Sequence, residues 1–310
     1  MHLLLTGVGG FVGSRLARLL LAHGERVSGT FFDEVPRAPG VTLYEADLLD
    51  AAAMAAAVRA AAPDAVVHLA GLSHVGESWT RMAEYFRVNV LGTENLLAAA
   101  AGRRVVVASS AEVYGVVPES EQPIGEQRQL DPRTPYALTK AAAERLALGR
   151  GAVVARCFNL VGPGQSARFA LPAFAAQLAA IARGEREAVL RVGNLSARRD
   201  FVHVDDGAEA YRLLAERGRP GETYNLASGR AFSLAEALDR LVGIAGVPAR
   251  IEIDPERVRA VDLPLLAGDA GRLRALGWKP RRGLDEALAD LWTEASGAAA
   301  APGDAARVPA

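Results

Sequence analysis

Short apolar runs alternate with longer stretches of helical period along the first half of the chain. The apolar runs predict β-strands at residues 2–6, 26–31, 41–44, 65–69, 104–108 and 152–156. The stretches between them are rich in Ala, Leu and Arg and predict helices, including residues 11–23, 50–62, 79–100 and 135–149. Strands that alternate with helices predict an α/β fold with a parallel, doubly wound sheet, whose ligands bind beyond the carboxyl ends of the strands.

From about Val161 the spacing becomes irregular. Gly162-Pro163-Gly164 interrupts the chain, and the later strand signals stand among helices without regular alternation, at residues 188–192, 223–226 and 250–253. We therefore expect two interleaved domains and a disordered tail rich in Ala, Gly and Pro. The expected ranges are a doubly wound domain over 1–160 with returning segments near 200–227, a smaller C-terminal α/β substrate-binding domain over 161–296, and the tail over 297–310.

Composition narrows the choice of partners. A net charge of −1 over 310 residues excludes the broad positive field of a general nucleic-acid binder. Cys157 is the only cysteine, so an internal disulfide is impossible and a reducing cytoplasm is expected. The opening run Leu3-Leu4-Leu5 is too short for a signal peptide or a membrane span and predicts a buried strand, so we expect no membrane partner.

A glycine-rich turn follows the first predicted strand and opens the first predicted helix. In Thr6-Gly7-Val8-Gly9-Gly10-Phe11-Val12-Gly13, glycines 7, 10 and 13 permit a tight turn, close approach of the backbone to a pyrophosphate, and close helix–strand packing. The helix N-terminus adds amide donors and a favourable dipole. An ordinary glycine-rich loop is the alternative, but the position between strand and helix favours a dinucleotide site.

The choice between NAD and NADP depends on the residues after the second strand. Asp33 lies 20 residues beyond Gly13, where a carboxylate could bind the adenosine ribose hydroxyls and favour NAD. Phe31 or Phe32 could occupy that position instead, and Arg37 could favour a 2′-phosphate. NAD is slightly favoured.

Asp47 follows the third predicted strand. Its carboxylate could reach the adenine amino group of a dinucleotide. An equally weighted alternative is that Asp47 caps the N-terminus of the next helix.

A candidate catalytic pair lies in Tyr136-Ala137-Leu138-Thr139-Lys140, which places a phenol and an ammonium on one helical face. An unperturbed tyrosine has a pKa of about 10. A nearby lysine and a positive nicotinamide would lower that pKa, so Tyr136 could transfer a proton while hydride moves. Ser110, after the fifth strand, could hydrogen-bond the same substrate oxygen. A surface Tyr–Lys pair is the alternative, but the order of glycine turn, serine and Tyr–Lys helix favours catalysis.

Several motifs together resemble the extended short-chain dehydrogenase/reductase family over about residues 2–295. They are the glycine turn, His68-Leu69-Ala70-Gly71, Asn89-Val90-Leu91-Gly92-Thr93, Ser109-Ser110-Ala111-Glu112-Val113-Tyr114-Gly115, Tyr136 through Lys140, and Arg156-Cys157-Phe158-Asn159-Leu160-Val161-Gly162-Pro163-Gly164. The resemblance implies a Rossmann domain for NAD(P) and a smaller domain for a nucleoside-diphosphate sugar. It also implies Ser110, Tyr136 and Lys140 as the catalytic trio.

The same resemblance implies further contacts and an assembly. Expected cofactor contacts are Gly7, Gly10, Phe11, Val12, Gly13, Asp33, Asp47, Leu48, Leu69, Ala70, Gly71, Tyr136 and Lys140. Family members commonly form dimers by packing two long helices from each subunit, here expected at 79–100 and 135–149.

Substrate contacts are expected both before and after Gly162-Pro163-Gly164. Asn159 and Arg199 match family residues that contact the diphosphate, and a guanidinium suits bidentate phosphate binding. Arg259 falls where related enzymes place a second phosphate arginine, although Ala260 follows it in place of the usual proline. Surface arginines are the alternative for both. His74 and Ser78 could line the sugar pocket, although His74 could equally be a structural hydrogen-bonder.

Within the family, the chain is most similar to GDP-4-keto-6-deoxy-mannose reductases. The similarity lies in Gly162-Pro163-Gly164-Gln165-Ser166 and in Arg191-Val192-Gly193-Asn194-Leu195-Ser196-Ala197-Arg198-Arg199-Asp200-Phe201. The second segment also occurs in GDP-mannose 4,6-dehydratases, so it favours a GDP-sugar more than it favours one reaction.

The residues that follow Ser110 (the serine loop) distinguish between the reactions that the family catalyses. Related 4,6-dehydratases carry a polar residue and a glutamate after the catalytic Ser or Thr, as acid and base for loss of water. Here Ala111 replaces the polar residue while Glu112 remains, and losing such a group typically costs about a hundred-fold or more in rate. We therefore expect reduction at carbon 4, with dehydration or 4-epimerisation as alternatives and a non-catalytic NAD(P)-sensing regulator as a remote one. No metal-ligand spacing is present.

Overall fold

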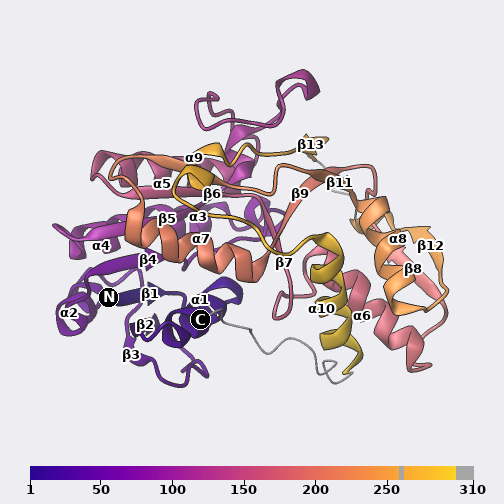
Figure 1. Ribbon diagram of the computed structural model, residues 1–310, viewed down its shortest axis with the longest axis horizontal. Helices are drawn as coiled ribbons and strands as arrows, with labels where there is room; N and C mark the ends of the chain where they lie inside the picture. The colour runs from indigo at the N-terminus through magenta and orange to yellow at the C-terminus, as the bar shows by residue number, and fades with distance from the viewer. Residues whose placement is uncertain (258–261, 298–310) are drawn as a thin grey trace.

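The main sheet contains seven parallel strands in the order β10-β6-β5-β4-β1-β2-β3 (Figure 1). The computed structural model describes residues 1–257 and 262–297. The strands are β1 (His2–Thr6), β2 (Arg26–Phe31), β3 (Thr42–Glu45), β4 (Ala65–His68), β5 (Arg104–Ser110), β6 (Val153–Cys157) and β10 (Thr223–Leu226). The chain moves outward from β1 to β3 and then outward in the opposite direction from β4, so the sheet is doubly wound. The predicted fold class is confirmed.

Helices cover both faces of this sheet, which explains the continuous apolar runs of its strands. Leu3 and Leu5 of β1 pack in one core with helices α1 and α7, whereas Leu4 packs in a second core with α2, α4 and α5. All three leucines are fully buried. The helices are α1 (Phe11–Ala22), α2 (Ala51–Ala61), α4 (Gly92–Ala99), α5 (Pro135–Gly149) and α7 (Val204–Arg217).

The single helix expected at 79–100 is divided. A 3₁₀ turn, η1 (Glu77–Trp79), is followed by α3 (Met82–Phe86), a π-helical segment η2 (Arg87–Leu91) and then α4. A π-helical turn contains an additional residue, which shifts the faces of the following helix and is common at functional sites. Asn89, inside this segment, is buried.

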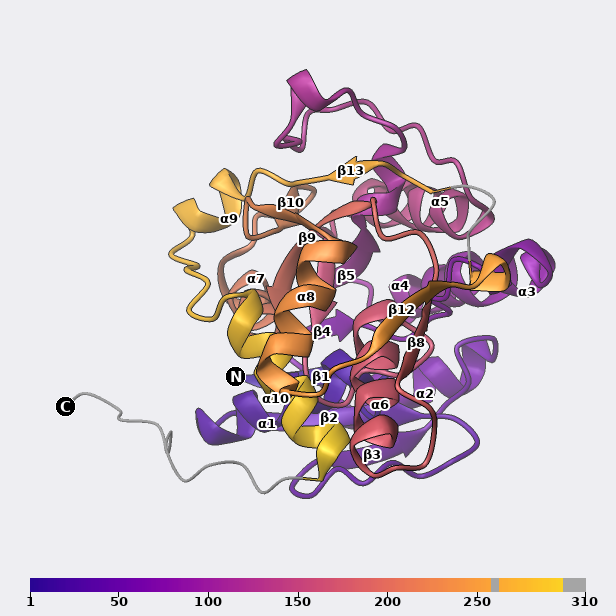
Figure 2. The same cartoon turned by 90° about the vertical axis from the view of Figure 1, so that its right-hand side faces the viewer.

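The second half of the chain forms a smaller α/β part, at the right in Figure 1. Its four-stranded sheet contains β7 (Asn159–Val161), β9 (Arg198–His203), β11 (Ala231–Ser233) and β13 (Leu265–Leu266), and a separate pair joins β8 (Val189–Val192) to β12 (Arg250–Ile253). Helices α6 (Ala170–Ala182), α8 (Leu234–Ala245) and α10 (Leu284–Ser296) pack together in a third core, as the turned view shows (Figure 2). The remaining elements are η3 (Ala111–Tyr114), η4 (Glu119–Glu121), η5 (Pro255–Arg257) and α9 (Gly271–Ala275).

The chain crosses between the two parts more than once. After β9, helix α7 and strand β10 return to the layers of the main sheet. The short strands β7, β9, β11 and β13 were not predicted. The expected tail lies outside the described residues, apart from Gly297.

Candidate active site

The glycine turn between β1 and α1 is packed too tightly for side chains. Gly7 has a φ of 70°, and a Cβ added there would lie 2.9 Å from the backbone N of Ala70. A Cβ on Gly13 would lie 2.1 Å from the carbonyl O of Gly7. Gly10 is the N-cap of α1 and provides no side-chain cap, so first-turn amides remain for a ligand. This cradle fits the pyrophosphate of a dinucleotide.

The loop after β4 lies beside this turn. Leu69 N donates to the carbonyl O of Thr6 (3.3 Å), and Ala70 N donates to Thr6 Oγ1 (3.2 Å). A Cβ on Gly71 would lie 2.8 Å from Asn89 Oδ1. The expected contacts at residues 69–71 are therefore adjacent to the glycine cradle.

Asn89 connects this loop to the helix that carries Tyr136. Its Oδ1 accepts from Leu72 N (2.8 Å), and its Nδ2 donates to Leu72 O (3.0 Å) and to Thr139 Oγ1 (3.1 Å). Asn89 belongs to a motif that was recognised in the sequence, but no role was predicted for it. The π-helical turn that contains it leaves no trace in a pattern read with a 3.6-residue period.

The two aspartates predicted to bind the cofactor, Asp33 and Asp47, lie in different surroundings. The last residue of β2 is Phe31, whereas Asp33 is exposed and has a φ of 72°. Asp47 follows β3, and its Oδ1 accepts from Leu49 N (2.9 Å). The alternative in which Asp47 caps the next helix is wrong, because Asp50 is the N-cap of α2. Leu48 is buried beneath Gly92.

Ser110, Tyr136 and Lys140 come together at the carboxyl end of β5. Ser110 ends β5, while Thr134 caps α5 by accepting from Ala137 N and so starts the helix one residue before Tyr136. The Ser110 hydroxyl lies close enough to the Tyr136 hydroxyl to lower its pKa. Lys140 Nζ donates to the carbonyl O of Ala108 on β5 (3.0 Å). Strand and helix therefore hold the expected trio together.

Burial dominates the electrostatics of the trio. It raises the pKa of Tyr136 above the ordinary value of 10.0, with the Ser110 hydroxyl acting in the opposite direction. It lowers the pKa of Lys140 from 10.5 to about 8. The protein's own groups together raise the pKa of Tyr136, whereas the sequence predicted that Lys140 would lower it. The other expected contribution was the positive charge of a nicotinamide.

Glu112 and Ala111 follow Ser110 in η3. Ser110 Oγ accepts from Glu112 N (3.2 Å), and the Glu112 charge contributes to raising the pKa of Tyr136. Glu112 is therefore near the proton-transfer group. Ala111 is buried and contributes no polar side-chain atom to the site.

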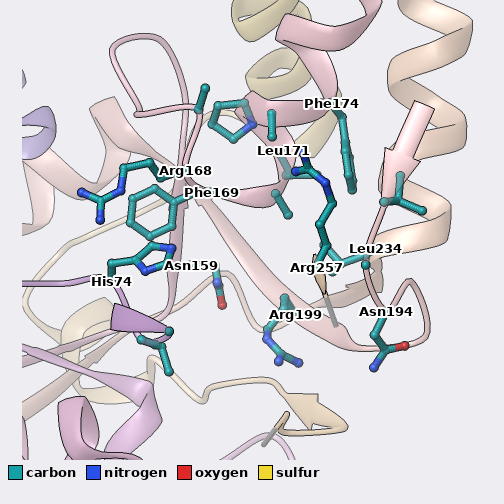
Figure 3. A pocket seen from close by; sticks show the side chains of 18 of the residues that line it. His74, Asn159, Arg168, Phe169, Leu171, Phe174, Asn194, Arg199, Leu234 and Arg257 are labelled. Carbon is teal, nitrogen blue, oxygen red and sulfur yellow. The ribbon is translucent and has the colours of Figure 1, made fainter. Parts of the chain in front are cut away.

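A cavity of about 500 Å³ lies between the two parts of the chain. Figure 3 shows His74 and Phe169 at one end, Asn194 and Leu234 at the other, and Asn159 and Arg199 between them. Asn159 begins β7 and Arg199 lies on β9, which pairs with β7. Strand pairing thus brings together residues 40 positions apart in sequence, which sequence reasoning could not show.

Arg199 is held by the protein itself. Its Nη2 pairs with Asp262 Oδ1 (2.6 Å), and its Nη1 donates to the carbonyl O of Leu263 (2.6 Å) and of Arg198 (3.0 Å). Asp262 also accepts from Asn194 Nδ2 (3.1 Å). The alternative that Arg199 is a surface arginine is wrong, since only 6% of it is exposed. The sequence did not indicate Asp262, because it lies 63 residues from Arg199 along the chain.

The remaining substrate candidates differ. His74 lines the cavity, its ring 5.9 Å from that of Phe169, and its Nδ1 accepts from Glu77 N (3.2 Å). Ser78 has no exposed surface and donates to the carbonyl O of Val75 (2.6 Å), so the structure does not place it on the cavity wall as expected. Arg259 lies outside the described residues.

Two findings apply to the described residues alone. Over residues 1–257 and 262–297, no group of three or more His, Cys, Asp or Glu could hold a metal ion. In that same part of the chain, no helix is long and apolar enough to cross a membrane.

Known proteins share both sequence and fold with this chain. The family model described as GDP-mannose 4,6 dehydratase matches residues 4–291. GDP-6-deoxy-D-mannose reductase of Pseudomonas aeruginosa is 36% identical over 299 residues, covering 93% of this chain and 94% of that protein. The structure of RMD from Pseudomonas aeruginosa complexed with NADPH matches with a TM-score of 0.83 and 34% identity, covering 96% and 99% of the two chains. UDP-glucose 4-epimerase of Thermus thermophilus, in complex with NAD, matches with a TM-score of 0.85 and 30% identity, covering 96% and 100%.

Fold and relatives define an NAD(P)-dependent enzyme of the extended short-chain dehydrogenase/reductase type, as predicted. The chain belongs to the GDP-mannose 4,6 dehydratase family, and its relatives include a reductase, epimerases and dehydratases of sugar nucleotides. The predicted class of enzyme and class of cofactor are confirmed.

Proposed function

We propose that this enzyme reduces the 4-keto group of a GDP-4-keto-6-deoxy-hexose with NAD(P)H. The observation that carries the proposal is the serine loop. Ser110, Tyr136 and Lys140 are assembled, while Ala111 stands where a dehydratase needs a polar acid–base partner. The similarity to GDP-6-deoxy-D-mannose reductase supports the same reaction.

In this mechanism the protein orients the ketone and supplies one proton. The glycine cradle and the loop after β4 would hold NAD(P)H, which when bound would supply hydride for carbon 4. Ser110 and Tyr136, whose hydroxyls lie close together, both bind the carbonyl oxygen. As that oxygen gains negative charge, Tyr136 donates its proton and the ketone becomes a secondary alcohol. The Lys140 ammonium stabilises the phenolate that remains.

We propose that the cavity binds the nucleoside diphosphate. Asn159 and Arg199 provide a carboxamide and a guanidinium at its centre. His74 lies at the end of the cavity formed by the part of the chain that carries Ser110, Tyr136 and Lys140. A guanidinium held by neighbouring groups is preorganised for a diphosphate. Arg259 remains a proposed second phosphate contact. A guanine base is favoured by the sequence similarity around residues 191–201.

Dehydration is the second candidate because Glu112 is retained near Tyr136. The two reactions differ in redox balance. A dehydratase or an epimerase returns the hydride that it removes, so its coenzyme is regenerated, whereas a reductase oxidises one NAD(P)H for each product.

The test is a stoichiometric assay of the purified enzyme. With GDP-4-keto-6-deoxy-mannose, we expect one equivalent of NAD(P)H to be oxidised per alcohol formed, and with GDP-mannose no loss of water. Conversion of an intact sugar nucleotide without added reductant would contradict the reductase proposal and favour the alternatives.

We also propose a cytoplasmic homodimer. Large apolar side chains are exposed along the segments expected to pair, namely Met82, Phe86, Leu91 and Leu138. Covering such a patch with a second copy removes it from water. Light scattering should give twice the mass of one chain, and Leu138→Glu should give the monomer. A monomeric wild-type enzyme would contradict the proposal.

A further inference from the structure

A buried carboxylate lies one helical turn beyond Lys140. Glu144 is 2% exposed and lies on α5, four residues after Lys140. Its carboxylate accepts two bonds from Arg156 Nε (3.1 Å each) and one from Arg156 Nη2 (2.9 Å). It also accepts from the hydroxyl of Ser109, the residue before the catalytic serine. A charged group so deeply buried is costly unless it is fully paired.

The same ion pair holds the other end of the serine loop. Arg156 Nη1 donates to the hydroxyl of Tyr114 (3.0 Å), and the guanidinium lies 4.9 Å from the centre of the Tyr114 ring. Tyr114 in turn donates to Asn225 Oδ1 (2.7 Å) on β10. Residues 109 and 114 are thus tied to Glu144 and Arg156, and the loop between them contains Ser110 and Glu112.

Titratable groups act on Lys140 from three elements. Glu144 belongs to α5, Cys157 ends β6, and His68 ends β4. Burial raises the pKa of Cys157 to about 12 and lowers the pKa of His68 to about 3, so both are uncharged near neutrality. The Glu144 carboxylate is the charged member of this set, and its negative charge favours the protonated form of Lys140.

We propose that Glu144 is a positioning residue of the reaction: its buried carboxylate keeps Lys140 in the ammonium form and, with Arg156, clamps both ends of the Ser110 loop to the catalytic helix. Burial alone works against the ammonium, because a buried cation without a counter-charge releases its proton more readily. The carboxylate opposes that loss without touching the substrate. The inference rests on the proposed function insofar as it concerns catalysis, but the charge of Lys140 is measurable by itself.

The composition permits a direct titration, because lysine occurs only at positions 140 and 279. Lys279→Arg leaves Lys140 as the single lysine, and ¹³C-labelled lysine then reports its protonation by NMR. We expect a midpoint near pH 8. Adding Glu144→Gln should lower the midpoint by about one pH unit or more, a tenfold change in the proton dissociation constant. The matched control Ser109→Ala removes a hydrogen bond to Glu144 but keeps the carboxylate, so the midpoint should stay in place.

Glu144→Gln leaves Arg156 without its counter-charge and could prevent folding. The double variant Glu144→Gln, Arg156→Gln replaces the ion pair by two amides and should lower the midpoint in the same direction, because the charge that acts on Lys140 is that of Glu144. An unchanged midpoint in either folded variant overturns the proposal.

The pH profile of NAD(P)H oxidation links this charge to the reaction. Activity should fall as pH rises through the Lys140 midpoint, since the ammonium is required. In Glu144→Gln this fall should move to lower pH by the same amount, whereas Ser109→Ala should lower the rate without moving it. A profile that stays in place while the NMR midpoint moves would overturn the catalytic part of the inference. Absence of reductase activity in the wild type would count against the proposed function alone, because the titration needs no substrate.

Discussion

Replacing Arg199 should weaken both the fold and the binding of the diphosphate, and the two losses can be separated. Arg199→Ala removes the ion pair with Asp262 and leaves the carbonyl of Leu263 without its donor. Breaking a buried pair costs about 3–5 kcal/mol. The Asp262 side chain is 19% exposed and keeps its bond from Asn194, so we expect about 3 kcal/mol, near the lower limit.

The stability loss is measured by thermal unfolding. An unfolding entropy of roughly 2.1 cal/mol/K per residue corresponds to roughly 1.5 °C per kcal/mol for 310 residues, so the midpoint should fall by roughly 5 °C. Asp262→Asn is the matched control: the carboxamide can still accept from Arg199, so the loss should be smaller than in Arg199→Ala. Asp262→Asn also leaves the Arg199 guanidinium without its counter-charge, so it changes the charge at the site while Arg199 is kept.

Binding is measured by calorimetry with GDP and, separately, with NADPH. Arg199→Ala should lose about 2 kcal/mol of GDP affinity, close to thirty-fold in Kd, because a buried phosphate contact disappears. Asp262→Asn should bind GDP at least as tightly as the wild type, since the carboxylate no longer competes for Arg199. NADPH affinity should be unchanged in both. Equal losses of GDP and NADPH in Arg199→Ala, or unchanged GDP affinity, would refute a direct role in diphosphate binding.

Three further outcomes are expected. Tyr136→Phe should lower single-turnover hydride transfer by about two to four orders of magnitude while NADPH affinity is retained, and near-normal turnover would contradict the proton-transfer role. Gly13→Ala should abolish NADPH binding in fluorescence titrations, because its Cβ would lie 2.1 Å from the Gly7 carbonyl O, and retained binding would show that the turn can relax. Asp33→Ala should leave the ratio of NADH to NADPH affinity nearly unchanged, because Asp33 is exposed and lies beyond the end of β2; a shift of about tenfold would restore its role in ribose binding.

The main sheet could be predicted from sequence because both of its faces are buried. Strands such as β1 and β4 are then short, continuous apolar runs, and each is followed by a helix with a clear period. The strands of the smaller sheet carry no such signal. β9 reads Arg198-Arg199-Asp200-Phe201-Val202-His203. Arg199 and Asp200 are buried there because they pair with side chains and backbone far along the chain.

The site could be predicted where its residues are held by local geometry. Tyr136 and Lys140 share one helical face, and Ser110 ends a strand, so spacing alone brings these groups to one edge. Asn89 and Asp262 act through contacts with residues 17 to 68 positions away, and no local pattern indicates them. Glu144 lies at a helical spacing from Lys140, which the sequence shows. Its burial depends on the ion pair with Arg156 of β6, which the sequence does not show.

The reaction and the nucleotide are determined by different parts of the molecule. Ser110, Ala111 and Glu112 lie where β5 of the main sheet ends, whereas Asn159 and Arg199 belong to the smaller sheet beside the third core. A change in the serine loop can therefore alter the chemistry without disturbing the cavity, and a change in the cavity can alter the substrate without disturbing the trio. Reductases, epimerases and dehydratases among the relatives all share about a third of their residues with this chain. Overall similarity thus identifies the family, while Ala111 in place of a polar residue argues against dehydration.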